Sequence, residues 1–176
     1  AHPVGGFERI TEDDWREGLY SQPKLDGVRC LIQAEFTDVF KELKVKAYSR
    51  TGKEWKNIDH ILEQLIPFFD EFPEVVLDGE LYNHNLRDNF EKIISLVRKT
   101  KPTDEDRLES ADMVQFHCYD VVDEKTNFPQ RDGFINFNFP LSGSLKRTGC
   151  DIAFNIEEVE VKHANFLEQG YEGSIL

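Results

Sequence analysis

The sequence of 176 residues has few cysteines and no long apolar run. Its three cysteines, Cys30, Cys118 and Cys150, include no Cys-x-x-Cys pair, and an odd number fits poorly with a disulfide framework. Since Cys30 and Cys118 lie in apolar stretches, we expect buried free thiols and a reducing cytoplasm. No apolar run has the length of a membrane-spanning helix, and residues 1–6 lack the basic and apolar regions of a secretory signal. We therefore expect a soluble cytoplasmic protein with no membrane partner.

Positive charge is also scarce. The chain has 21 Lys and Arg residues against 34 Asp and Glu residues, a formal net charge of −13. Because nucleic-acid phosphates attract Lys and Arg, this balance argues against a nucleic-acid-binding protein, although a local basic surface or a basic partner domain would reverse the argument. The one local basic cluster consists of Lys92, Arg98, Lys99 and Lys101, on and after a predicted helix. Contact with DNA phosphates is one interpretation of this cluster, and a solvated helix face is the one we favour.

Periodic apolar residues predict strands and helices that are interleaved without a regular βαβ rhythm. Strands are predicted over residues 28–36, 44–50, 74–82 (interrupted at 78–80) and 113–122. Helices are predicted from Thr11, with Asp14 in a capping box, from Asn57 or Asp59 to Phe72, from Asp88, and over 157–169 before Gly170. Residues 128–153 have weak periodicity and predict no element. This order favours one α+β domain with mainly antiparallel sheets flanked by helices.

The sharpest chemical feature is the segment Lys24-Leu25-Asp26-Gly27-Val28-Arg29. A lysine at the entrance to a buried strand can lose its proton if burial or a neighbouring cation lowers its pKa, and a neutral amine is a good nucleophile towards phosphorus. Asp26-Gly27 predicts a tight turn through which the backbone can approach a nucleotide. Arg29 leaves the turn along the strand and could hold a phosphate or a sugar. An isolated Asp-Gly would indicate no more than a hairpin turn with flanking charges.

This segment resembles the nucleotidyl-transfer motif shared by ATP-dependent DNA ligases, RNA ligases and mRNA capping enzymes. The resemblance implies that Lys24 attacks the α-phosphate of ATP, forms a covalent lysine–AMP and releases pyrophosphate. It also implies the nucleotidyltransferase (ATP-grasp-like) fold of the DNA ligase family, with Mg²⁺ as the metal.

Four further segments resemble the remaining motifs of the superfamily, in the same order along the chain. Ser49-Arg50-Thr51-Gly52 is similar to the motif that contacts nick phosphates, which makes Ser49, Arg50 and Arg29 candidate DNA ligands. Leu77-Asp78-Gly79-Glu80-Leu81 resembles the motif whose glutamate lies near the ribose and the metal, which implies these roles for Glu80. The alternatives are a plain turn at Ser49–Gly52 and a second Asp-Gly turn with a solvated Glu80.

The last two motifs and one flanking residue complete the candidate site. Phe116 to Val122 resembles the motif whose aromatic residue stacks on the base, which implies that role for Tyr119, although a core aromatic is an equal alternative. Gly170 to Leu176 resembles the motif whose glutamate, here Glu172, is a second metal-site carboxylate. Gln22 corresponds to the position that reads the adenine amino group, and an exposed glutamine at a strand start is its alternative.

The motifs together resemble an ATP-dependent DNA ligase most, in particular the small T4-type bacteriophage ligases. The resemblance implies a monomer in a bacterial or phage-infected cell that seals nicked double-stranded DNA in replication, repair or recombination. We expect residues 1–176 to be the adenylation domain, with the family's last lysine motif and its C-terminal OB-fold domain outside this sequence. An RNA ligase or capping-type nucleotidyltransferase is the first alternative, and a non-catalytic nucleotide-binding domain is the second.

Overall fold

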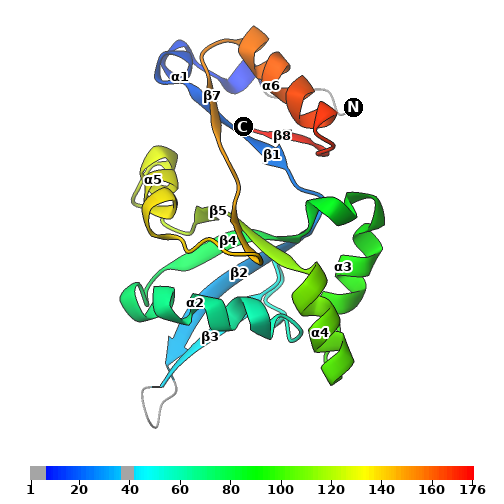
Figure 1. Ribbon diagram of the computed structural model, residues 1–176. Coiled ribbons are helices and arrows are strands. Elements are labelled where there is room, and N and C mark those ends of the chain that lie inside the picture. Colours follow the sequence, from blue (N-terminus) through cyan, green and yellow to red (C-terminus); the bar gives the residue numbers. More distant parts are fainter. Residues whose placement is uncertain (1–6, 37–41) are drawn as a thin grey trace. The chain divides into compact units, whose positions relative to one another are not determined.

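The computed structural model describes residues 7–36 and 42–176 of the chain, so the expectation about a secretory signal at residues 1–6 lies outside the described residues (Figure 1). Within the described part, no helix has both the length and the apolar character needed to cross a membrane. Contacts divide the described residues into two units. The terminal unit combines the residues up to Leu25 with Gly149–Leu176, and the central unit is Asp26–Thr148.

The central unit is built on a five-stranded sheet in the order β3-β2-β4-β5-β6. Its strands are β2 (Val28–Phe36), β3 (Leu43–Tyr48), β4 (Val76–Tyr82), β5 (Gln115–Val121) and β6 (Leu145–Arg147). Every neighbouring pair is antiparallel except β5 and β6, which are parallel. The expectation of an α+β fold with mainly antiparallel sheets is confirmed.

Helices bury one face of this sheet in an apolar core. The helical elements of the central unit are α2 (Asp59–Glu71), the 3-10 helix η2 (His84–Asn89), α3 (Phe90–Val97), α4 (Asp104–Met113) and α5 (Phe128–Asn138). Ile61, Leu65 and Phe69 of α2 are fully buried in the same cluster as Ile32 and Leu77 of the sheet. Because side chains alternate across a strand, the residues between these core positions lie on the opposite face, and several of them are polar.

The terminal unit contains a smaller sheet in the order β7-β1-β8. Its elements are η1 (Phe7–Arg9), α1 (Glu12–Glu17), β1 (Leu19–Lys24), β7 (Asp151–Ala153), α6 (Ile156–Glu168) and β8 (Gly173–Ile175). The first half of β1 pairs with β7 and the second half with β8, both antiparallel. Ala153, Val159 and Phe166 supply its buried apolar contacts.

Most predicted elements are confirmed, including the Thr11–Asp14 capping box and the strand Val28–Phe36. The interruption predicted at 78–80 is wrong, because β4 runs unbroken through these residues and the irregularity is a register shift against β5. Asp88 does not cap a helix: it lies inside η2, and Asn89 is the N-cap residue of α3.

Two parts of the chain were not predicted. Helix α4 begins with its own capping box, Thr103 with Asp106, but it buries only Ser110 and so has no apolar stripe to predict it. Residues 128–153 contain α5, β6 and β7, where no element was expected. Helix α5 buries only Ile135 while Phe137 is 85% exposed, so its apolar residues do not form the single stripe that predicts an amphipathic helix.

Gly79 gives a direct test of packing between β4 and β5. A Cβ atom at this position would lie 2.5 Å from the carbonyl oxygen of His117 and 2.5 Å from the ring of Phe116. We expect Gly79→Ala to lower the free energy of unfolding by about 1–3 kcal/mol, as overpacked cores do, in urea unfolding followed by circular dichroism.

The matched control is Gly133→Ala in α5, where the added Cβ meets no atom within 4 Å. This change should leave stability equal or raise it by up to about 1 kcal/mol, because alanine favours a helix over glycine. Equal urea midpoints for the two variants would contradict this description of the sheet.

Candidate functional site

Lys24 and Glu172 form an ion pair in the terminal unit. Lys24 ends β1 opposite Gly173 of β8, and its Nζ lies 2.7 Å from Oε1 of Glu172. The backbone N–H of Glu172 also donates to the carbonyl oxygen of Lys24, at 3.2 Å. Both side chains are a little over 40% exposed, so the pair adds at most about 1 kcal/mol to stability. Its main effect is to hold the amine of Lys24 in one place while leaving it accessible.

Gln22 lies two residues before Lys24 and therefore on the same face of β1. It is paired with Ile175 of β8, and only 9% of the residue is exposed, so the alternative of an exposed glutamine is wrong. The structure thus brings three of the predicted site residues together in one small sheet, with Gln22 and Lys24 on β1 and Glu172 directly before the adjacent strand β8.

Helix α6 adds a residue that was not predicted as part of the site, His163. Nδ1 of His163 lies 2.9 Å from Oγ of Ser174, one residue beyond the position opposite Lys24. A Cβ atom on Gly173 would lie 3.2 Å from the His163 ring, so the ring packs closely over this strand. His163 therefore fixes β8, and with it Glu172, relative to α6. No motif marks His163, because only the fold brings it next to Ser174.

In the central unit, the face of the sheet opposite the apolar core carries Arg29, Asp78, Glu80 and Tyr119. Arg29 of β2 donates to both carboxylate oxygens of Asp78 on β4, with Nε–Oδ1 at 3.0 Å and Nη2–Oδ2 at 2.6 Å. Such a fork is rigid, and it raises the pKa of the Arg29 guanidinium. Arg29 is close to half exposed, so one side of its guanidinium remains open to a further anion.

Glu80 is the most perturbed carboxyl group of this face. Burial raises its pKa to about 7. The Tyr119 hydroxyl, which donates to Oε2 at 3.5 Å, and the charge of Arg29 lower the pKa, while the negative charges of Asp78 and Asp26 raise it further. Burial is also the main cause of the raised pKa of Tyr119. The alternative of a solvated Glu80 in a plain turn is therefore wrong.

The Asp26-Gly27 turn approaches β4 very closely. A Cβ atom on Gly27 would lie 2.5 Å from Cγ of Glu80 and 2.6 Å from the carbonyl oxygen of Leu81. Only glycine fits this contact without displacing Glu80 or the β4 backbone. The observed close approach is to a candidate site residue, and the predicted approach to a nucleotide stays a prediction.

The segment Ser49–Gly52 forms the predicted turn after β3. The Gly52 N–H donates to the Ser49 carbonyl oxygen at 2.9 Å, and Gly52 has a φ of +78°, which favours glycine. The Ser49 hydroxyl accepts from the Lys53 N–H at 3.0 Å. Arg50, in the middle of the turn, is exposed.

Among residues 7–36 and 42–176, no three His, Cys, Asp or Glu side chains are arranged to hold a metal ion. The two predicted metal ligands belong to different units: Glu80 lies in the central unit, and Glu172, bound to Lys24, lies in the terminal unit. Magnesium is commonly held by one or two carboxylates together with substrate phosphates. The partly buried Glu80, whose neighbours Asp78 and Asp26 disfavour its ionised form, has the chemistry of one such ligand.

Three solved structures have similar folds. The structure named Pmar-Lig_PreS3 matches with a TM-score of 0.65 and 21% identity, over 92% of this chain and 39% of its own. A structure from work on DNA binding by Lig E DNA ligases matches with a TM-score of 0.61 and 20% identity, over 88% and 53% of the two chains. Chlorella virus DNA ligase-adenylate also matches with a TM-score of 0.61, at 18% identity, over 97% and 55%. The chain thus spans about 40 to 55% of the length of these proteins.

Structural similarity at such low sequence identity shows only the fold. The protein family is assigned by a family model. No curated protein matches the chain in a sequence comparison. The model described as "ATP dependent DNA ligase domain" matches residues 1–176, which is the whole sequence. The chain therefore belongs to the ATP-dependent DNA ligase domain family.

Proposed function

We propose that this chain is the adenylation domain of an ATP-dependent DNA ligase and that Lys24 carries the AMP. The observation on which the proposal rests is the position of Lys24. Lys24 is the last residue of β1, and its amine is accessible to solvent and lies 2.7 Å from the carboxylate of Glu172. The chain that carries this lysine belongs to the ligase domain family. The proposed intermediate is a phosphoramidate between Nζ of Lys24 and the α-phosphorus of ATP.

The first step needs the lone pair of the Lys24 amine. Its ammonium group gives up a proton, for which Oε1 of Glu172 is the adjacent acceptor in the terminal unit. The N–P bond then forms as the bond from the α-phosphorus to the bridging oxygen breaks, and its electron pair leaves with pyrophosphate. In the second step an oxygen of a 5′-phosphate attacks the same phosphorus and releases Lys24. In the third step the 3′-hydroxyl attacks the 5′-phosphorus and AMP leaves.

Four other residues are proposed to hold the nucleotide. The Gln22 amide, which offers both a donor and an acceptor, reads the adenine edge. Tyr119 stacks on the base, and its contact with Glu80 fixes the ring position. Glu80 accepts from the ribose, and Arg29, held in a fork by Asp78, presents its open side to the nucleotide or to the DNA.

Glu80 and Glu172 are the residues proposed to hold Mg²⁺ together with the phosphates of ATP. When bound, the ion would screen the negative charge of the triphosphate. The environment of Glu80 supports its part in this proposal, because a cation would stabilise the ionised carboxylate that burial and two neighbouring carboxylates disfavour.

The proposed nucleic-acid substrate is nicked double-stranded DNA, contacted by Ser49 and Arg50. The Ser-Arg-Thr-Gly order of this turn resembles DNA ligases rather than capping enzymes, which makes an RNA ligase the nearer alternative and a GTP-dependent capping enzyme the more distant one. The third alternative, a non-catalytic nucleotide-binding domain, is opposed by the presence of Lys24, Glu80 and Glu172 together. We further propose that the protein acts as a cytoplasmic monomer.

Intact-mass spectrometry after incubation with ATP and Mg²⁺ tests the role of Lys24. We expect the wild type to gain the mass of one AMP and Lys24→Ala to gain none, because the nucleophile is removed. Lys162→Ala, on α6 of the same unit, is the control and should gain AMP normally. An adduct that persists in Lys24→Ala, or a wild type that reacts with GTP alone, would contradict the proposal.

The burial of Glu80 predicts how stability depends on pH. Its pKa is about 7 in the folded state against 4.5 as the ordinary value, so between these pH values the folded state binds more protons than the unfolded state. The free energy of unfolding should therefore fall as the pH rises from about 4.5 to 7 and be level above 7. Because Glu80→Gln has no charge to bury, we expect it to be more stable than the wild type at pH 8, by about 1–3 kcal/mol.

Urea unfolding from pH 4 to 8 measures this difference. Glu71→Gln, which alters an exposed glutamate of α2, is the control and should keep the wild-type pH dependence. Parallel stability profiles for Glu80→Gln and the wild type would show that the Glu80 carboxyl group is not buried as described.

A further inference from the structure

A groove with cationic walls lies beside the Ser49–Gly52 turn of the central unit. It has a volume of about 540 Å³ and is lined by residues at the start of β2, by the turn and the residues that follow it, and by Arg98 at the end of α3. The charged residues that line it are Arg29, Arg50, Lys53 and Arg98, and no carboxylate is among the lining residues. A groove lined by four basic residues and by no Asp or Glu is unusual in a chain with a net charge of −13.

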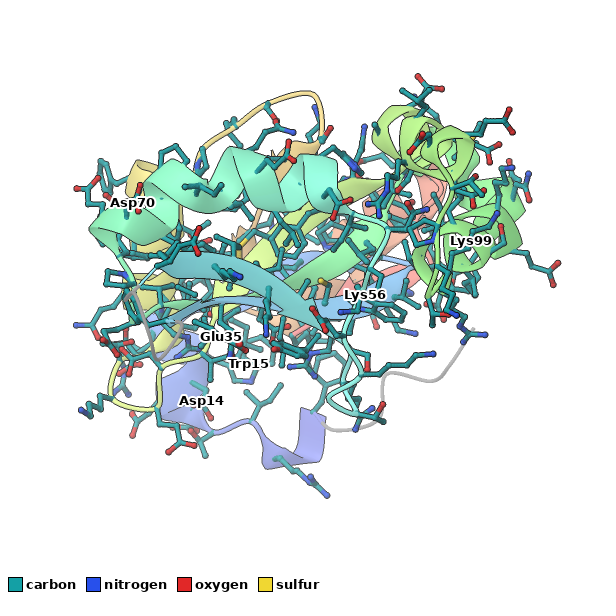
Figure 2. The ribbon with its side chains drawn as sticks, turned by 90° about the horizontal axis from the view of Figure 1, so that it is seen from below. Asp14, Trp15, Glu35, Lys56, Asp70 and Lys99 are labelled. Atoms are coloured by element: carbon teal, nitrogen blue, oxygen red, sulfur yellow. The ribbon has the colours of Figure 1, made fainter. Side chains whose placement is uncertain are left out.

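Three of these four cations have no ion-pair partner in the part of the chain that the structure describes. Half of the described lysines and arginines of this unit form ion pairs, among them Lys46–Glu35, Lys56–Glu54, Lys92–Glu109, Lys99–Asp106, Arg107–Asp59, Arg131–Asp120 and Arg147–Asp132. Figure 2 labels Lys56 and Lys99, two members of these pairs. Within the described residues, Arg50, Lys53 and Arg98 have no carboxylate within the 4.0 Å of an ion pair. Three cations without a carboxylate partner thus line one groove, where an anion would have access.

The basic cluster predicted at residues 92–101 is divided by these ion pairs. Lys92 and Lys99 are bound to Glu109 and Asp106, which fits the solvated helix face favoured from the sequence. Arg98 is different, because it lines the groove together with residues that lie almost fifty positions earlier in the chain.

A buried hydrogen bond fixes Arg98 beside the turn. Asn57, 1% exposed, donates from Nδ2 to the carbonyl oxygen of Leu96 and to that of Asp106, both at 3.1 Å. This ties the segment that follows the turn to the end of α3. Arg98 then caps α3, with its backbone N–H donating to the Ile94 carbonyl oxygen at 3.1 Å, so its side chain starts from a fixed backbone position.

We propose that Lys53 and Arg98 bind phosphates of a DNA strand in this groove, next to the phosphate contacts proposed for Ser49 and Arg50. The inference rests on the proposed function and extends its DNA-binding surface to α3. The chemistry favours a nucleic-acid backbone, because its phosphates are spaced along a strand and match several unpaired cations that are spread over an open groove. The planar guanidinium of Arg98 can also bind a phosphate through two donors.

Fluorescence anisotropy with a labelled nicked DNA duplex, measured over a series of salt concentrations, tests the proposal. The logarithm of the binding constant falls as the logarithm of the salt concentration rises, and each phosphate contact that is lost reduces the magnitude of this slope by about 1. We therefore expect Lys53→Ala and Arg98→Ala each to weaken binding and lower the slope by about 1, and the double variant by about 2. Arg98→Lys should keep the wild-type slope, because the charge remains. Lys125→Ala removes an exposed lysine outside the groove and should change neither value.

AMP addition, measured on the same variants, separates this inference from the proposed function. Lys53→Ala and Arg98→Ala should gain AMP like the wild type, which also shows that they are folded. If the two variants gain AMP and bind the nicked duplex with the wild-type slope, the groove inference is wrong. It is also wrong if the wild type does not bind the nicked duplex at low salt. If no protein gains AMP but the slopes change as expected, the groove binds DNA and the proposed function fails.

Discussion

The antiparallel pairing of β1 with β8 is the constraint on which the proposed chemistry of the terminal unit depends. It joins residues 148 positions apart, because Lys24 lies opposite Gly173 and its amine therefore meets the carboxylate of Glu172. The exposed ion pair adds little to stability, so the strands and the His163–Ser174 contact, rather than the charges, hold the geometry. A rigid backbone frame of this kind can hold an amine in place and still leave it open to a nucleotide.

In the central unit, one face of the sheet carries charged groups while the other face packs in the apolar core. Alternation along β2, β4 and β5 separates the two sets of side chains. Arg29 neutralises Asp78 directly, but burial of Glu80 is only partly offset by Tyr119 and Arg29, which leaves its pKa near 7. A carboxyl group in this condition changes its charge readily when a cation arrives, and that property suits a transient metal ligand better than a permanent structural contact.

The sequence predicted the elements with strong periodicity and the turns that require glycine. The strand Val28–Phe36, the helix of Ile61 and Leu65 and the turn at Gly52 follow from local rules. Helix α5 could not be predicted because its apolar side chains point in several directions. The Lys24–Glu172 pair, His163 and the groove position of Arg98 also could not, because each depends on contacts between distant segments that no local pattern contains.

Peptide mapping tests the central claim, that Lys24 carries the nucleotide, most directly. The protein is incubated with ATP and Mg²⁺, digested, and sequenced by tandem mass spectrometry under conditions that preserve phosphoramidates. The account predicts that the added AMP is found on the side chain of Lys24 and on no other residue. AMP on a different lysine, or Lys24 recovered without modification from protein that has gained AMP, would contradict it.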